Sequence, residues 1–255
     1  MLLAAFGAWG QTPDTVFLDE LTWPELRKQI GDGKTTIIVP IGGTEQNGPH
    51  MVLGKHNVRV KALSEKIARA LGNALIAPVI AYVPEGSIHP PTAHMRFPGT
   101  ITVPNATFEQ VLESAARSFK AHGFRDVVLL GDHGGYQNSE KAVADRLDRE
   151  WRNTPVRVHV ISEYYQAAEA GFTKQLRSRG YADAEIGTHA GLADTSLALA
   201  VDPRLIRADQ LASKPDAAAG VSGDPRRAST DLGQLAVDAI VAQTVAAINV
   251  ATARR

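Results

Sequence analysis

The sequence contains no cysteine. This absence excludes disulfide bonds and thiolate ligands, so any metal ion bound by the chain must be held by histidine, aspartate and glutamate side chains. An excess of charge of one sign is lacking as well, because 27 basic residues balance 27 acidic residues. A balanced charge creates no overall field that would favour nucleic acid or an anionic membrane. We therefore expect the partner to be a small neutral or mixed-charge molecule.

Long hydrophobic runs are also lacking. Residues 1–12 are apolar and rich in small side chains, but the stretch is too short to span a bilayer and has no basic start. It is either the end of a signal peptide, which would make the protein periplasmic or secreted, or an N-terminal extension of a cytoplasmic protein. No other segment approaches transmembrane length. We therefore expect no membrane insertion and an α/β domain over residues 13–255.

Strand patterns alternate with helix patterns along the chain. Short apolar runs predict strands at 35–41, 74–83, 126–130 and 156–161, with a strand-like piece at 97–103. Apolar residues three or four positions apart predict helices at 57–71, 106–122, 139–151 and 231–250, with shorter helices after Thr22 and near 188–200. Residues 207–230 read as a loop. With no repeat or linker, this pattern predicts a single α/β domain with a mostly parallel sheet and helices on both faces.

Two of the predicted strands end in glycines that are followed by acidic and histidine residues. After the strand at 35–41 come Glu45, His50 and His56, and the strand at 126–130 runs into Asp132 and His133. Because the carboxyl ends of parallel strands meet at one edge of a sheet, we expect these side chains to lie close together. The long loop between residues 82 and 99 has the character of a binding loop or lid.

A third turn adds two further candidates, His189 and Asp194, where the chain enters a helix. Carboxylates together with imidazoles form a nitrogen and oxygen ligand set that suits zinc or manganese and leaves positions open for water. The sequence therefore predicts a divalent metal centre at the carboxyl edge of the sheet.

Four ordered blocks of the sequence resemble a known family. Residues 43–56, Gly-Thr-Glu-Gln-Asn-Gly-Pro-His-Met-Val-Leu-Gly-Lys-His, are similar to its signature Gly-Ser/Thr-x-Glu-x-His-Gly-Pro-His-Leu-Pro-Leu-x-x-Asp. Residues 97–100, 133–135 and 189–196 look like its later blocks, in the same order. The resemblance is to the creatininase (creatinine amidohydrolase) family and covers about residues 18 to 205.

The resemblance implies an α/β metal-dependent amidohydrolase with one or two divalent ions, acting on cyclic amides, formamides and related C–N bonds, often as a homo-oligomer. By position, Glu45 and His133 match metal ligands of the family, and Asp194 stands where many members have a glutamate ligand. His189 matches the histidine that handles protons during ring opening, and His50 matches a histidine that lines the site. We therefore assign His189 and His50 as catalytic candidates.

The departures from the family pattern change the expected metal content. Asn47 stands where the family has a histidine ligand, and His56 stands where it has the aspartate that joins two ions. An imidazole nitrogen cannot bridge two ions as a carboxylate does. We therefore expect one ion, zinc before manganese, held by Glu45, His56, His133 and Asp194. Because Tyr136 also replaces a family asparagine, creatinine is not the expected substrate.

The expected function is hydrolysis of a cyclic amide, or of a related lactone, by a metal-activated water molecule. Two alternatives stay open on the residues: a relative that binds metal or a small ligand without turnover, and a metal-dependent isomerase or lyase of a sugar-like ketone. His89 and His94 are read as surface or wall residues of the long loop, and Asp132 as a turn cap. A serine hydrolase is disfavoured because no nucleophile elbow surrounds Ser196.

Overall fold

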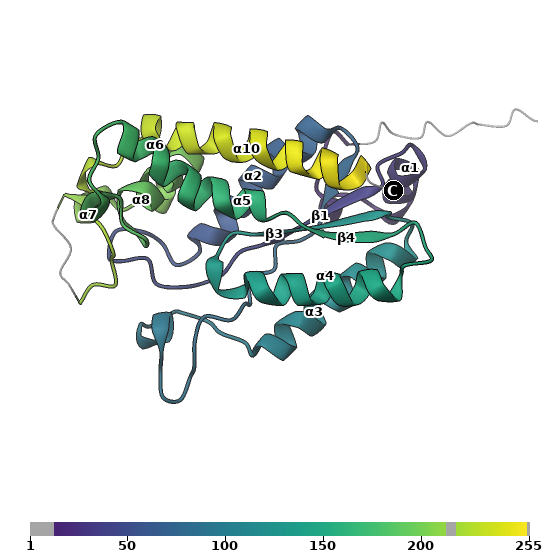
Figure 1. The fold of residues 1–255 in the computed structure, drawn as a ribbon, viewed down its shortest axis with the longest axis horizontal. Helices are drawn as coiled ribbons and strands as arrows, with labels where there is room; N and C mark the ends of the chain where they lie inside the picture. Colours follow the sequence, from purple (N-terminus) through teal and green to yellow (C-terminus); the bar gives the residue numbers. More distant parts are fainter. Residues whose placement is uncertain (1–12, 213–217, 254–255) are drawn as a thin grey trace, which may run out of the picture.

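The computed structural model describes residues 13–212 and 218–253, so the predicted signal remnant at 1–12 lies outside the described residues. Within them, four parallel strands form one sheet in the order β2-β1-β3-β4 (Figure 1). The strands are β1 (Thr36–Ile41), β2 (Ala74–Ile76), β3 (Asp126–Gly131) and β4 (Arg157–Val160).

Helices connect and cover the strands. The α-helices are α1 (Trp23–Gly31), α2 (Lys55–Leu71), α3 (Asn105–Ala121), α4 (Gln137–Glu150), α5 (Ser162–Gln166), α6 (Phe172–Ser178), α7 (Asp183–Ile186), α8 (Leu192–Val201), α9 (Ala208–Leu211) and α10 (Thr230–Ala253). Short 3-10 turns lie at Leu18–Glu20, Ala93–Arg96, Gly134–Tyr136, Pro203–Leu205 and Pro225–Arg227, and a π turn at Ala167–Gly171.

The sheet separates two apolar cores because side chains alternate between its faces along each strand. Ile38 of β1 packs in one core with residues of α2, α8 and α10, and Val39 packs in the other core with residues of α3 and α4. Figure 1 shows α10, α5 and α2 on one side of the sheet and α3 and α4 on the other. The predicted α/β architecture with helices on both faces is confirmed.

The second strand is much shorter than the sequence pattern predicts. β2 ends at Ile76, and the predicted continuation to residue 83 is irregular apart from one bridge between Ile41 and Ile80. Pro78 has no N–H to donate, so it cannot continue a ladder, and Pro40 on β1 has none either. The strand-like piece at 97–103 is also irregular, although the Ile101 N–H donates to the Thr44 carbonyl at 2.9 Å.

Residues 162–186, which the sequence patterns left without a prediction, form α5, the π turn, α6 and α7. These pieces have between four and seven residues, which is too short for a helical period to stand out. Short turns of helix also interrupt the predicted loop at 207–230.

The expectation that no segment beyond residues 1–12 approaches transmembrane length is wrong for the last helix. α10 is, among the described helices, the one that meets the length and composition criteria for a membrane span. It also contacts α2, α5 and α8, and Ala236, Val237 and Ile240 are buried in the core beside α2.

Candidate metal centre

Glu45 lies at the centre of the candidate site. The chain reaches it from β1 through Gly42 and Gly43, where a side chain does not fit: a Cβ at Gly42 would lie 2.9 Å from the backbone of Asn57, and Gly43 has φ +154°. The Glu45 carboxylate is fully buried. Burial alone would raise its pKa, but the hydrogen bond from His56 and the positive charge of Lys55 outweigh burial and hold the pKa below its ordinary value.

His56 lies between two carboxylates. Its Nε2 is 2.8 Å from Glu45 Oε1, and its Nδ1 is 2.7 Å from Asp132 Oδ2. Asp132 also accepts hydrogen bonds from Arg59 Nε at 2.8 Å and from the Tyr164 hydroxyl at 2.6 Å. Asp132 is therefore part of a buried polar network instead of the predicted turn cap. Both nitrogens of His56 already face carboxylates, so its role as a metal ligand stays a prediction.

Asp194, the fourth expected ligand, is held by two cations. Lys55 Nζ pairs with its Oδ2, and Arg59 Nη1 lies 2.7 Å from its Oδ1. The backbone N–H of Ala190 also donates to Oδ2 at 2.9 Å. Burial would raise the pKa of Asp194, but the charges of Lys55 and Arg59 outweigh burial and lower it well below its usual range. Its oxygens are engaged by these partners, and its ligand role also stays a prediction.

His133 approaches Glu45 from the end of β3, as the sequence predicts for neighbouring parallel strands. Its Nε2 lies 3.6 Å from Glu45 Oε2, and its Nδ1 lies 3.7 Å from Glu85 Oε2. Burial, followed by the electrostatic influence of His56, lowers the pKa of His133 to about 3. The ring is therefore neutral at pH 7, which is the form that binds a metal ion.

A single hydroxyl group joins the two strand-end loops. The Tyr136 hydroxyl lies 2.8 Å and 2.7 Å from the carbonyl oxygens of Ile41 and Gly42, at the end of β1. It accepts the backbone N–H groups of Asp132 and His133 at 3.0 Å, at the end of β3. Burial raises the pKa of this phenol well above 10, so it stays a neutral donor. Tyr136 thus fixes the loop of Glu45 relative to the loop of His133.

His189 and His50, the two catalytic candidates, lie in different surroundings. His189 Nε2 is 2.9 Å from the backbone carbonyl oxygen of Gln46 and 3.1 Å from the side-chain amide nitrogen of the same residue, and its Nδ1 lies 3.8 Å from Glu45 Oε1. Burial, then Lys55, lowers the pKa of His189 to about 4. His50 is instead buried against α8, with Nε2 3.0 Å from Thr195 Oγ1. Both catalytic roles stay predictions.

Two residues of the long loop join the site although the sequence analysis did not select them as ligands. Glu85 is 3 % exposed, and neither of its carboxylate oxygens has a hydrogen-bond partner among residues 13–212 and 218–253. Burial, and then the charge of Glu45, raise the pKa of Glu85 to about 9. His94 Nε2 lies 3.1 Å from Glu45 Oε2. One signal was available: β2 is parallel to β1, so the chain that leaves it starts at the same edge of the sheet.

The geometry brings four ligand-type side chains together. Glu45, Glu85, His94 and His133 offer atoms that all lie within 4.8 Å of one another. In the part of the chain that the structure describes, Oε2 of Glu45 and both oxygens of Glu85 are buried and make no hydrogen bond of acceptable geometry, although His94 Nε2 lies near the first of them. Buried carboxylates without partners are costly unless a proton or a cation compensates them. These residues therefore fit a divalent ion with nitrogen and oxygen ligands.

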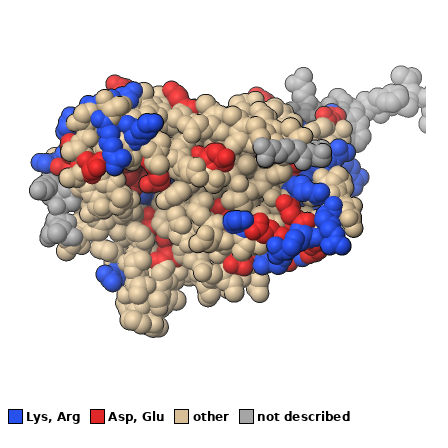
Figure 2. Space-filling view, viewed as in Figure 1, with Lys and Arg blue, Asp and Glu red and all other residues tan. Residues whose placement is uncertain are grey.

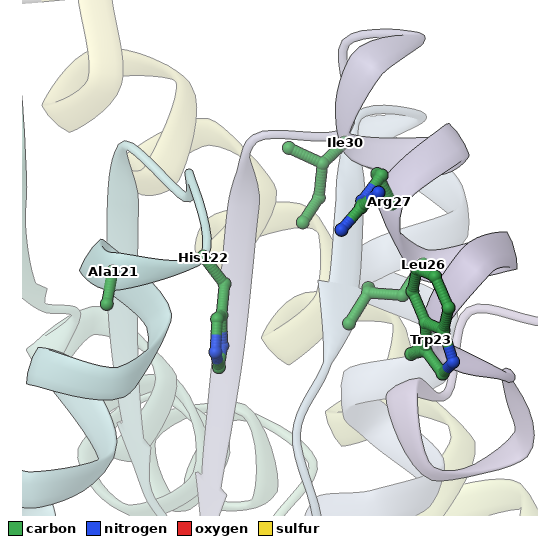
Figure 3. Close-up of a pocket in the computed structure, with 6 residues that line it drawn as sticks. All are labelled: Trp23, Leu26, Arg27, Ile30, Ala121 and His122. Carbon is green, nitrogen blue, oxygen red and sulfur yellow. The ribbon is translucent and has the colours of Figure 1, made fainter.

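The cluster opens into a polar pocket, whereas a second pocket at the other end of the sheet is apolar. The polar pocket is lined by charged and hydroxyl side chains that include Lys55, His94, Tyr165, Thr188 and His189. The apolar groove lies between α1 and the end of α3, where the chain enters β1 and β3, and is lined by Trp23, Leu26, Arg27, Ile30, Ala121 and His122 (Figure 3). On the face shown in Figure 2, acidic and basic side chains are interspersed at both ends of the molecule.

The chain is similar to proteins of known sequence. The family model described as creatinine amidohydrolase matches residues 19–248. A creatinine amidohydrolase of Pseudomonas putida is 30 % identical over 208 residues, which are 80 % of this chain and 78 % of that protein. A 3-dehydro-scyllo-inosose hydrolase of Thermotoga maritima is 29 % identical over 124 residues, which are 49 % of this chain but only 38 % of that protein.

Solved structures give the same result. A manganese creatininase superposes with a TM-score of 0.76 at 28 % identity, and the match covers 92 % of this chain and 98 % of that one. A mutant creatininase described as the Zn-Zn type has a TM-score of 0.77 at 27 % identity, over 93 % of this chain and 98 % of its own.

Proposed function

Because the chain belongs to the creatininase family of hydrolases, we propose that it is a metal-dependent hydrolase that opens a cyclic amide, or a related lactone, of a small polar molecule. The observation that carries this proposal is the cluster at the carboxyl edge of the sheet. There, buried carboxylate oxygens without hydrogen-bond partners face imidazole rings inside a polar pocket.

Glu45 and His133 are the residues from two strand ends that would hold the ion. A zinc or manganese ion at this point would polarise the carbonyl under attack and lower the pKa of a water molecule from about 15.7 to near 7. We propose a single ion, with zinc preferred, because Asn47 and His56 stand where the family signature has a histidine and an aspartate.

The protein's own groups would position the substrate and move protons. His189 Nδ1 lies 3.8 Å from Glu45 Oε1, and the lowered pKa of about 4 keeps the ring neutral at pH 7, so a ring nitrogen can accept a proton from the attacking water. Transfer of that proton to the leaving nitrogen or oxygen contributes roughly a hundredfold to ten-thousandfold in rate. The Tyr165 hydroxyl and Thr188 line the same pocket and are available to bind polar groups of the substrate.

We propose that creatinine is not the substrate. Tyr136 occupies the position of a family asparagine, and its hydroxyl is used to hold the two strand-end loops together instead of facing the pocket. Residues 131–136 of this chain therefore offer a different set of polar groups from those the family signature describes.

A second candidate is ring opening of a polyhydroxylated cyclic ketone. The lining of the pocket is dominated by charged and hydroxyl side chains, which suits a substrate with many hydroxyl groups. The relative named 3-dehydro-scyllo-inosose hydrolase supports this class of substrate, although the match spans 38 % of that protein.

The test is metal-dependent turnover. Protein stripped with a chelator and protein reloaded with zinc or manganese would be assayed on lactams, lactones, cyclic polyhydroxy ketones and creatinine. We expect turnover of at least one lactam or lactone by the reloaded protein only, and none of creatinine. A metal-loaded protein that turns over no member of the panel would instead favour a binding role.

Location and assembly belong to the same proposal. We propose a periplasmic or secreted protein, with residues 1–12 as the signal remnant, and a homo-oligomer. α10 supports self-association because it is long and apolar and most of its apolar stretch is not buried within the described chain, Val250 included. Cell fractionation and light scattering after size-exclusion chromatography test the two points separately.

A further inference from the structure

The loop between β2 and α3, residues 77–104, brings two side chains to the cluster. Glu85 sits in its first half, where its backbone N–H donates to Thr102 Oγ1 at 2.9 Å. The Thr102 hydroxyl in turn donates to the Gly86 carbonyl at 3.0 Å. Glu85 is thus fixed by the returning half of the same loop, and its carboxylate is held in the interior without a hydrogen-bond partner of its own.

The second half of this loop is hydrogen-bonded to the loop after β1, which carries Glu45. The Ile101 N–H donates to the Thr44 carbonyl at 2.9 Å, and the Gln46 N–H donates to Thr100 Oγ1 at 3.2 Å. His94 is placed by a further contact, 3.1 Å between its Nδ1 and Gln46 Nε2, which leaves Nε2 directed at Glu45. His94 thus approaches Oε2 of Glu45, whereas Lys55 and His56 approach Oε1.

Glu85 and His94 differ from the other acidic and histidine residues nearby in their ion-pair partners. Asp132 and Asp194 are compensated by Arg59 and Lys55, and His56 has a carboxylate at each nitrogen. Among the described residues, Glu85 has no lysine or arginine within ion-pair distance, and the nearby basic ring is that of His133, whose Nδ1 lies 3.7 Å from Glu85 Oε2. The carboxyl groups of Glu45 and Glu85 then face the imidazole rings of His94 and His133, which together form a nitrogen and oxygen ligand set that suits a divalent cation.

We propose that Glu85 and His94 are metal ligands, so that a single divalent ion is held by Glu45 and His133 from the strand ends and by Glu85 and His94 from the loop. This inference rests on the proposed function, because it concerns the same metal centre. His56 then acts as a positioning residue that orients Glu45 through the 2.8 Å contact between Nε2 and Oε1. The ion also ties the loop that lines the pocket to the rigid edge of the sheet.

The first experiment measures zinc affinity in the full chain, with a chromophoric chelator as competitor. Glu85→Gln and His94→Ala are each expected to weaken zinc binding by at least about tenfold. Two matched controls are available. Glu140→Gln changes another buried carboxylate without a partner, outside the cluster, and His89→Ala changes an exposed histidine of the same loop. Both controls are expected to bind zinc as the unmodified chain does.

The second measurement needs no variant, so a variant that fails to fold does not leave the inference undecided. Crystals of the unmodified chain grown with zinc would be examined by anomalous diffraction. A peak at ligand distance, about 2.0 to 2.2 Å, from Glu85 and His94 supports the inference. A peak that contacts Glu45 and His133 but neither loop residue, or unchanged zinc affinity in both loop variants, overturns it while leaving the proposed function standing. Absence of any zinc binding by the unmodified chain overturns both.

Discussion

The two edges of the sheet differ in the chemistry of the side chains that line them. At the carboxyl edge, four histidine side chains and Glu85 surround Glu45 beside a polar pocket; His56 and Glu85 are buried, and the other three histidines are half-buried. At the amino edge, α1 and the end of α3 form an apolar groove with Arg27 and His122 as its charged or titratable members. The groove could receive an apolar group, but it offers no set of ligands. The chemistry of the lining residues, more than the presence of a hollow, marks the active edge.

The strongest way to break this comparison is to remove the histidine delivered by β3. His133→Ala is expected to abolish both bound metal and turnover, since it deletes one of the two strand-end ligands. Metal content by plasma emission spectroscopy and an activity assay measure the two effects. His122→Ala, at the amino edge, is the matched control and should change neither. Retention of metal and activity in the His133 variant would count against the assignment.

The second-largest effect is expected from the removal of a buried cation. Lys55→Met leaves Asp194 and Glu45 without the ammonium group that pairs with Asp194 and lies 3.9 Å from Glu45. We expect the free energy of unfolding to fall by about 3 kcal/mol, because Glu45 and Asp194 then stay buried with less compensating charge, Asp194 keeping only the Arg59 guanidinium at 2.7 Å among the described residues. Urea denaturation measures the change.

The control for this variant is an ion pair of the same type on the surface. Lys28 pairs with Asp32 on and after α1, and the side chain of Lys28 is 64 % exposed. Lys28→Met should change the free energy of unfolding by less than about 1 kcal/mol. Equal losses in the two variants would show that the carboxyl edge does not depend on its buried cation.

Glu140 sharpens the comparison within the carboxyl edge itself. This carboxyl group packs against Gly131 and is fully buried, with no hydrogen-bond partner among the described residues, and burial raises its pKa well above 4.5. A raised pKa stabilises the folded state below about pH 4.5, and that stability is lost as the pH rises toward the folded-state pKa. Glu140→Gln should remove a slope of up to about 1.4 kcal/mol per pH unit.

Urea denaturation at several pH values between 5 and 8 checks this slope, expressed as the free energy of unfolding against pH. Glu163→Gln, at an exposed position, should keep the slope of the unmodified chain. If Glu140→Gln also keeps that slope, the carboxyl group has found a compensating partner in solution.

The smallest effect is expected at the amino edge. Trp23 is 69 % exposed and stacks on the guanidinium of Arg27, whose central carbon lies 4.8 Å from the ring centroid. Trp23→Ala should cost less than about 1 kcal/mol of stability and leave zinc affinity and turnover unchanged. A loss of turnover in a folded Trp23 variant would mean that the groove, too, serves the reaction.

The parts of the site that follow strands were predictable, and the parts that follow loops were not. Glu45 and His133 come directly after apolar runs whose strand character is local, and parallel pairing then brings their loops together. His56 and Asp194 were expected as ligands from positions in a motif, but a motif does not reveal that Lys55 and Arg59 are buried beside them. The partners of a carboxylate are set by tertiary packing.

Glu85 is a second residue whose place in the site depends on tertiary contacts that the sequence does not show. It stands alone in a loop with several prolines and glycines, and no spacing rule connects residue 85 to residues 45 and 133. Its place depends on contacts such as the one with Thr102, seventeen positions later. Pro78 likewise explains why the predicted strand stops early, although the residues after it favour a strand: a missing N–H ends the ladder whatever the local preference.

The Tyr136 hydroxyl has a consequence for how the site would acquire an ion. Its four backbone contacts join the two strand ends before any ligand arrives, so the entropy of bringing Glu45 and His133 together is lost during folding and not again at binding. Binding of the ion should then leave the strand ends that carry Glu45 and His133 nearly unchanged. Any conformational change on binding should be confined to the loop at residues 82–99. Amide hydrogen exchange followed with and without zinc would show that asymmetry as new protection in residues 82–99 and little change at the strand ends.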